Sequence, residues 1–308
     1  MNHVKSITIL ALALVAFITG AVHLSFAQQH QQTTFSSAEA ATTALLLAVQ
    51  SHDEDALLNI LGAGSELVST GDDVRDKLEH ERFAQKYQEM HRVVREPDKT
   101  MVLYVGVENW PFPVPLGSRN GVWRFDAETG SNEVLCRRIG ENEEMVIGAF
   151  RLLVLAEQQY QLRGETSVPE YTARFVSTNG VHNGLDQQGE SAVPDGLATA
   201  GIDDQLAAGK PTVPFYGYYF RILTAQGKHA PGGAMSYISN GKMTGGFAFI
   251  AYPAEYRRSG VKTFIAGSDG TVHEKDLGPD TAKIASSMTA YDPDSSWKMA
   301  DQYPGDSQ

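Results

Sequence analysis

The segment Pro214–Gly278 carries the clearest fold signal in the chain and reads PFYGYYFRILTAQGKHAPGGAMSYISNGKMTGGFAFIAYPAEYRRSGVKTFIAGSDGTVHEKDLG. It contains several runs of β-branched and aromatic residues, and glycine-rich turns separate these runs. This arrangement predicts an antiparallel sheet with short loops. The sequence Gly267–Gly270 (GSDG) predicts a hairpin turn between strands at 261–266 and 271–274.

Two of these runs also indicate which side chains face the core. Gly245–Tyr252 is almost wholly apolar, as expected of a central strand that is covered on both faces. Pro253 ends this run, because proline has no N–H to donate to a neighbouring strand. In the run 215–224, alternation places Tyr216, Tyr218, Phe220 and Ile222 on one face and Tyr219 and Arg221 on the other.

The first residues have the features of an export signal. Lys5 provides a positive charge, Ile9–Val22 is apolar, and Ser25-Phe26-Ala27 fits a cleavage site. We therefore predict a signal peptide at 1–27, cleaved after Ala27, with a retained anchor as the alternative. The predicted location is periplasmic or secreted, with no integral membrane segment after signal removal. Residues 28–35 form a polar linker.

The charge of the chain excludes several classes of partner. Among its 308 residues are 37 acidic and 25 basic side chains, which give a net charge of −12. Removal of Lys5 with the signal would make this one unit more negative. Nucleic acids and anionic membranes require a basic surface, so neither is predicted as a partner. Cys136, the single cysteine, excludes an intramolecular disulfide.

Residues 36–140 predict a first unit of helices followed by an antiparallel sheet. Ser36 and Glu39 form a capping box at the start of a helix, and further helices are expected at 53–61 and 74–94. Leu78 and Tyr87 are among the expected core contacts of the third helix. Strands are expected at 100–107, 121–125 and 133–139; in the last of these, Val134 and Cys136 alternate with polar residues and Cys136 is expected to be buried.

Residues 141–300 predict a second unit, in which a helix packs on the sheet of 214–278. Glu141 begins the helix, and its apolar residues recur at helical spacing: Val146, Ala149, Phe150, Leu153 and Tyr160. Residues 301–308 are expected to form a disordered tail. The predicted fold class is therefore α+β, whether the two units make one domain or two.

Motifs for catalysis are absent from the sequence: it has no G-x-S-x-G, H-E-x-x-H, Walker loop, dinucleotide fingerprint or C-x-x-C. Glu255, Asp269 and His273 are candidate acid–base groups, provided that they converge in one pocket. The histidines His182, His229 and His273 have no standard metal-ligand spacing. We therefore predict no metal and no cofactor.

Tyrosines are the better candidates for binding. A tyrosine at the rim of a sheet offers a large contact area at low entropic cost, which suits a peptide or glycan. About half of this set must face the core, because alternate strand positions point inward. The candidate binding residues are Tyr216, Tyr218, Tyr219, Tyr252 and Tyr256.

Several blocks of residues together resemble a family. The chain resembles bacterial exported proteins grouped as domain of unknown function 2950, and the resemblance covers residues 36–300. It implies export but brings no activity, cofactor or catalytic residue. The blocks are RRIGENE (137–143), AEQQY (156–160), FYGYYFRILTAQG (215–227), GGFAFIAYPAEYRRSGVKTFIAGSDGTVHEKDLG (245–278) and YDPDSSW (291–297).

The second unit also resembles the globular head of type IV pilin-like and pseudopilin proteins. In these proteins a helix packs on an antiparallel sheet, and a G-x-x-x-F-x-x-x-x-D-G ending is present here as Gly260, Phe264, Asp269 and Gly270. The long apolar helix half that such subunits use to polymerise is absent before Glu141. The resemblance therefore implies a pilin-head-like fold without filament formation.

The segment Ala48–Leu61 (AVQSHDEDALLNIL) resembles the cone-shaped fold of nuclear transport factor and ketosteroid isomerase-like proteins.

The sequence leaves three hypotheses for the function of this protein. The first is a non-enzymatic envelope-associated or assembly protein whose tyrosine-rich sheet binds a protein or polysaccharide. The second is an envelope hydrolase that uses the candidate acid–base groups. The third is small-ligand binding in the first unit, within a cone around Trp110 and Trp123, which requires an apolar cavity.

Overall fold

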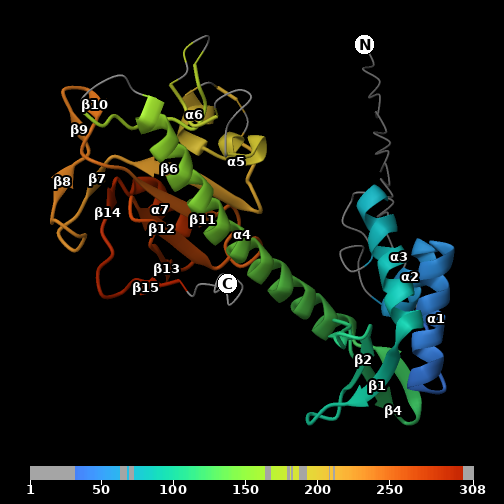
Figure 1. The fold of residues 1–308 in the computed structure, drawn as a ribbon. Coiled ribbons are helices and arrows are strands. Elements are labelled where there is room, and N and C mark those ends of the chain that lie inside the picture. Colours follow the sequence, from blue (N-terminus) through green and yellow to red (C-terminus); the bar gives the residue numbers. More distant parts are fainter. Residues whose placement is uncertain are drawn as a thin grey trace, which may run out of the picture.

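The computed structural model describes residues 32–62, 68, 73–163, 168–178, 181, 183–186, 193–207, 209–210 and 212–300. Two groups of helices and strands are joined by one long helix, α4 (Ala127–Arg163) (Figure 1). The predicted signal peptide, the first part of the predicted linker and the predicted tail lie outside the described residues. Over the described ranges, the helices lack the combination of length and hydrophobicity that a bilayer-spanning segment requires.

Three helices begin the first unit: α1 (Ala38–Ser51), α2 (Glu54–Leu61) and α3 (Asp73–Glu89). The side chain of Ser37 accepts a hydrogen bond from the backbone N–H of Ala40 (3.0 Å) and caps α1, so the cap lies one residue after the predicted Ser36. Asp53 caps α2 in the same way through the N–H of Ala56 (2.9 Å). Gly62 ends α2 with a φ of 70°, a conformation that glycine adopts readily.

The first sheet is antiparallel and follows these helices. It contains β1 (His91–Arg95), β2 (Met101–Val105), β3 (Trp110–Pro111), β4 (Leu116–Arg119) and β5 (Val122–Phe125), in the order β1-β2-β4-β5 with β3 also paired to β2. The third helix thus ends at Glu89, five residues before its predicted end, and residues 91–95 pair with β2 instead. Leu78 is 57% exposed, contrary to its predicted core position, whereas Tyr87 is buried.

The helix α4 overturns the predicted strand at 133–139. Asp126 accepts a hydrogen bond from the N–H of Thr129 (3.1 Å) at the start of α4, and Glu133 pairs with Arg137 one turn later (2.8 Å). These local contacts favour a helix where the alternation of Val134 and Cys136 indicated a strand. Cys136 is consequently exposed rather than buried. The predicted boundary at 140 lies inside α4, which begins 14 residues before Glu141.

The second sheet is antiparallel in the order β15-β13-β12-β11-β6. Its central strand, β11, is buried at all six positions, as the apolar sequence predicted. The predicted turn joins β12 to β13, and the N–H of Gly270 donates to the carbonyl of Gly267 (3.0 Å). The strands are β6 (Tyr218–Leu223), β11 (Ala248–Pro253), β12 (Lys262–Gly267), β13 (Val272–Asp276) and β15 (Lys298–Met299).

The second half of α4 covers one face of this sheet. The ring of Phe150 lies 6.0 Å from that of Phe220 and 6.5 Å from that of Phe249. The predicted apolar stripe is therefore the core side of α4. On the opposite face lie α7 (Thr281–Ser287) and β14 (Ala290–Tyr291). The remaining short elements are α5 (Asp195–Thr199), α6 (Ile202–Ala207), β7 (Ala225–Gln226), β8 (Met235–Ser236), β9 (Ile238–Ser239) and β10 (Lys242–Met243).

Each unit has a hydrophobic core of its own. The first core extends from Ala38 to Phe125 and the second begins at Val146, with no buried residue in common. Between the two cores, α4 forms polar contacts with the second unit. Asn142 Nδ2 donates to the carbonyl of Ser259 (2.9 Å), and Glu143 Oε1 accepts the N–H groups of Val261 (2.8 Å) and Lys262 (2.9 Å). The α+β class predicted from the sequence is confirmed.

Candidate functional site

A cavity of about 550 Å³ lies in the first unit, between α1, α2 and α3 and the first sheet; we call it the N-terminal cavity. Val134 and Glu141 of α4 also reach its edge. Its lining divides into an apolar floor, an aromatic wall and a charged rim. The residues are Leu45, Val49, Leu57, Leu61, Val68, Asp76, Glu79, His80, Arg82, Phe83, Lys86, Val105, Trp110, Phe112, Val134 and Glu141.

The floor consists of buried aliphatic side chains from three elements. Leu45 and Val49 come from α1, Leu57 and Leu61 come from α2, and Val105 comes from β2. Helical spacing brings each α1 and α2 pair to one side of its helix. Alternation in β2 turns Val105 to the same side as the buried Leu103. These described side chains are all aliphatic, so the floor can receive an apolar group.

Three aromatic rings form the wall. The ring of Phe112 lies 5.5 Å from that of Phe83 and 6.3 Å from that of Trp110. Trp110 is 39% exposed, so its ring reaches from the wall towards solvent. The guanidinium of Arg137 lies 5.2 Å from the centre of this ring and donates to the carbonyl of Pro111 (2.9 Å). The first half of α4 thereby holds the wall in place.

The rim carries charges of both signs, most of them from α3. Arg82 pairs with Glu79 (3.1 Å), and Lys86 forms an ion pair with Glu108. The imidazole ring of His80 stacks on that of His52, with 5.9 Å between ring centres. An apolar floor next to such a rim suits a molecule that has an apolar body and a polar end.

The structure corrects two of the predicted tyrosine contacts. Tyr218 is fully buried, and its hydroxyl donates to the carbonyl of Lys262 (2.9 Å). Burial next to Glu143 raises the pKa of this hydroxyl. Tyr252 is also buried, and its ring packs on that of Tyr219 (6.0 Å). Both side chains belong to the core, because their strand positions face elements that cover the sheet.

The other three tyrosines reach the surface to different degrees. Tyr216 is 47% exposed and adopts a φ of 45°, just before β6 begins. Tyr219 is half-buried. Tyr256 is half-buried as well, and its hydroxyl donates to the carboxylate of Asp276 (3.0 Å). The predicted tyrosine surface is therefore reduced to these three side chains.

The candidate acid–base residues do not converge as a group of three. Ala248 of β11 pairs with Gly267 of β12, which places the Asp269 turn at the start of β11, whereas Glu255 follows its end. At a rise of about 3.3 Å per residue, the seven residues from 248 to 255 separate them by roughly 20 Å. The hydrolase hypothesis required all three in one pocket, and this strand register does not provide it.

Asp269 and His273 do lie in one polar group, which also includes two tyrosines that the sequence did not single out. The hydroxyl of Tyr291 lies 3.3 Å from His273 Nδ1. Burial raises the pKa of Tyr291 and of Tyr237 to about 12, and Asp269 adds to both shifts. Burial lowers the pKa of His273. The group holds the Gly267–Gly270 turn against β14 and does not line the N-terminal cavity.

The other two candidate metal-ligating histidines are not shown to lie beside His273. His229 pairs with Asp292 (3.1 Å) at the surface, and His182 lies outside the described residues. Within the part of the chain that the structure describes, no group of three or more His, Cys, Asp or Glu side chains is arranged to hold a metal ion.

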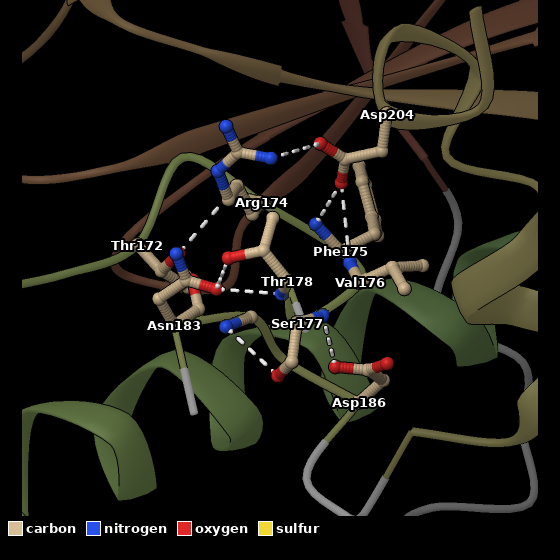
Figure 2. Close-up of polar contacts among 10 residues, drawn as sticks. Thr172, Arg174, Phe175, Val176, Ser177, Thr178, Asn183, Asp186 and Asp204 are labelled. Atoms are coloured by element: carbon tan, nitrogen blue, oxygen red, sulfur yellow. Dashed lines mark hydrogen bonds and ion pairs between the residues drawn. The ribbon is translucent and has the colours of Figure 1, made fainter. Parts of the chain in front are cut away.

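A polar network around residues 172–186 was missed by sequence reasoning (Figure 2). The carboxylate of Asp204 accepts the backbone N–H groups of Phe175 and Val176, and Asp186 accepts that of Ser177. Burial raises the pKa of Asp204, and the hydrogen bonds oppose this shift. Because these carboxylates satisfy backbone groups of the loop, the network orders the loop rather than offering free ligands.

Glu157 of α4 lies next to this loop and is completely buried. Its Oε2 accepts the N–H of Thr172 (3.1 Å), whereas Oε1 has no hydrogen-bond partner among the residues that the structure describes. Burial raises the pKa of this carboxyl to about 8. At neutral pH the side chain is therefore mostly protonated. In the sequence, the burial of Glu157 is indicated only by its position beside Ala156 on the apolar side of α4.

No curated protein and no solved structure matches this chain. A family model described as "Protein of unknown function (DUF2950)" matches residues 32–300, which confirms the family resemblance of the sequence blocks. Since this match spans most of the 308 residues, the chain belongs to the DUF2950 family.

Proposed function

We propose that this protein binds a small amphipathic molecule in the N-terminal cavity and catalyses no reaction on it. The observation that carries the proposal is the cavity itself, with its buried aliphatic floor next to a charged rim. A volume of about 550 Å³ falls within the range of ligand pockets, roughly 300–1,000 Å³. The apolar body of the ligand would contact Leu57 and Val105, and its polar end would meet the rim.

The cavity is preferred to the sheet of the second unit as the binding site. Two of the five candidate tyrosines are buried there, so a partner could contact only Tyr216, Tyr219 and Tyr256. The second unit instead supports α4, whose first half holds Trp110 through Arg137. We propose a pilin-head-like scaffold for this unit, supported by a helix packed on an antiparallel sheet.

Export is the second part of the proposal. Lys5, the apolar run 9–22 and the small residues before Gln28 support a signal that is cleaved after Ala27. The ligand would then be a molecule of the periplasm or the extracellular medium. Expression of the full chain in a bacterial host and mass measurement of the secreted product checks this, and a product that retains residues 1–27 would contradict it.

The binding test uses 1-anilinonaphthalene-8-sulfonate, which has an apolar ring system and an anionic end. Binding in the cavity should quench Trp110, because this ring lines the wall. Trp110→Phe should remove most of the quenching. Trp297→Phe is the control, since Trp297 lies in the second core, and it should leave the quenching unchanged. Quenching that survives Trp110→Phe would place the probe elsewhere.

A second pair of variants tests the floor. Leu61→Phe adds volume inside the cavity and should weaken probe binding about tenfold, equivalent to about 1.4 kcal/mol. Leu58→Phe is the matched control, because Leu58 lies in the same helix but does not line the cavity. Equal binding by the two variants, with both folded by circular dichroism, would overturn the proposed site.

A further inference from the structure

The first sheet has a second face, on the side opposite the helices and the N-terminal cavity. Leu103, Leu116 and Phe125 are buried in the first core, so the residues that alternate with them along the strands point the other way. Residues that are paired across adjacent strands point to the same side of a sheet. We call this surface the arginine face, and its members are Arg92, Tyr104, Gly117, Arg119, Val122 and Arg124.

Charge is distributed unevenly in the first sheet. Its five strands contain four arginines, two in β1 and one each in β4 and β5, and no aspartate or glutamate. The whole chain, by contrast, has a net charge of −12. Arg95 pairs with Met101 and shares its position on the helix side, whereas the other three arginines belong to the arginine face. The acidic net charge therefore conceals a locally basic surface.

The arginines of this face are exposed to solvent. Within the part of the chain that the structure describes, Arg119 and Arg124 form no ion pair. The guanidinium of Arg92 lies 5.3 Å from the centre of the Tyr104 ring. A side chain added at Gly117, the partner of Arg124, would meet no atom within 4 Å. The face is therefore open beside two of its three arginines.

Carboxylates near the ends of these strands make local contacts. Glu96 follows β1, and it accepts a hydrogen bond from the hydroxyl of Tyr104 (2.8 Å). Asp126 follows β5, and it accepts the N–H of Thr129 at the start of α4 (3.1 Å). Neither carboxylate forms an ion pair with a described arginine of this face, so the face keeps its positive charge.

We propose that the arginine face binds an acidic polysaccharide that carries carboxylates along its length. With about 3.3 Å per residue and about 4.8 Å between strands, the register places Arg124 about 8 Å from Arg119 and about 20 Å from Arg92. One small anion cannot reach all three side chains, whereas an extended polymer can. The planar guanidinium pairs with a carboxylate through two parallel hydrogen bonds, which suits a sugar acid.

Other polyanions fit this face less well. Single-stranded nucleic acids bind by stacking bases on aromatic rings, and the ring of Tyr104 is half-buried beneath Arg92. Anionic bilayers are bound by clusters of about four to eight basic residues, more than the three present on this face. Export, as proposed for this chain, also favours a polysaccharide over a nucleic acid, because it would bring the protein to the cell envelope.

Isothermal titration calorimetry with polygalacturonate tests the proposal, because every sugar of this polymer carries a carboxylate. The wild-type chain should bind it and should not bind neutral dextran. Arg119→Gln with Arg124→Gln should weaken binding at least tenfold. The matched control is Arg95→Gln with Arg138→Gln, which removes the same charge from the helix side of the sheet and from α4 and should bind as the wild type does.

All four substituted arginines are exposed, so both double variants should keep the wild-type circular dichroism spectrum. Binding by the wild type should also weaken as sodium chloride is raised, since ion pairs with the polymer are screened by salt. This salt dependence needs no variant and holds even where a substitution disturbs the fold. Affinity that does not change with salt would contradict the proposal.

The remaining outcomes separate the possible occupants of the face. Absence of binding to polygalacturonate, or equal weakening in the two double variants, would overturn the proposal. Tighter binding to phosphatidylglycerol vesicles or to duplex DNA would assign the face to a membrane or a nucleic acid instead. A dimer in sedimentation velocity that only the variant at 119 and 124 loses would assign it to a second copy of this chain.

Discussion

The two cores of this protein are built from similar residues but are filled to different degrees. In the second unit, β11 is buried at every position, and the rings of Phe150, Phe220 and Phe249 occupy the space between helix and sheet. In the first unit, buried leucines and valines line a pocket of about 550 Å³ that is open to solvent at its charged rim. Buried apolar residues therefore fill the core of the second unit and line a cavity in the first. The difference depends on how closely the helices and the sheet approach each other.

The largest effect on stability should come from replacing a buried leucine by alanine in each core. Leu153→Ala removes a fully buried side chain from the filled core and should lower the free energy of unfolding by about 4 kcal/mol. Leu57→Ala should cost about 2.5 kcal/mol, because the space it leaves joins a cavity that already exists. Urea denaturation followed by circular dichroism measures both. Equal losses would mean that the cavity closes in solution.

Substitutions that add volume should again destabilise the second core more than the first, with a smaller effect. Ala251→Val places two methyl groups in the closed centre of β11 and should cost about 2 kcal/mol. Val105→Ile points into the N-terminal cavity and should be neutral or stabilising by about 0.5 kcal/mol. Thermal unfolding of the two variants compares them. A loss at Val105 as large as that at Ala251 would show that the cavity floor cannot accept added volume.

A third effect, the slope of stability with pH, concerns Glu157 in the filled core. Its folded pKa of about 8 lies above the usual 4.5, so between these values the folded state holds a proton that the unfolded state has lost. Its contribution to stability is complete below about pH 4.5 and is lost as the pH rises to 8, by at most about 1.4 kcal/mol per unit.

Glu157→Gln should remove this slope, because the amide does not titrate. Urea denaturation at several pH values measures it, with the exposed Glu255→Gln as the control that keeps the slope. An unchanged slope in Glu157→Gln would show that other groups cause the pH dependence.

Local sequence signals predicted the second sheet well. The turn Gly267–Gly270 and the apolar run of β11 depend on neighbouring residues alone, and both are confirmed. The first half of α4 was predicted wrongly, because Val134, Cys136 and the polar residues between them fit a strand period. In the structure, the hydrogen bond that caps the helix at Asp126 and the Glu133–Arg137 ion pair stabilise a helix instead.

The cavity could be named as an alternative but not located from the sequence. Its floor combines Leu45, Leu57 and Val105, which are far apart along the chain, and their meeting depends on the packing of three helices on a sheet. Trp110 was correctly suggested as a lining residue. Trp123 does not line the cavity; it pairs with Phe35 at the edge of the sheet instead. The burial of Glu157 likewise depends on a loop that only the folded chain brings to α4.

The path of the chain through α4 has a consequence for how the protein can be divided. Among the described residues, the two sheets exchange no strand, and the chain passes from one unit to the other through α4 alone. The two units therefore lie at different positions along α4, which connects them (Figure 1). A single proteolytic cut near Gly140 would separate them without breaking a strand pairing in either sheet.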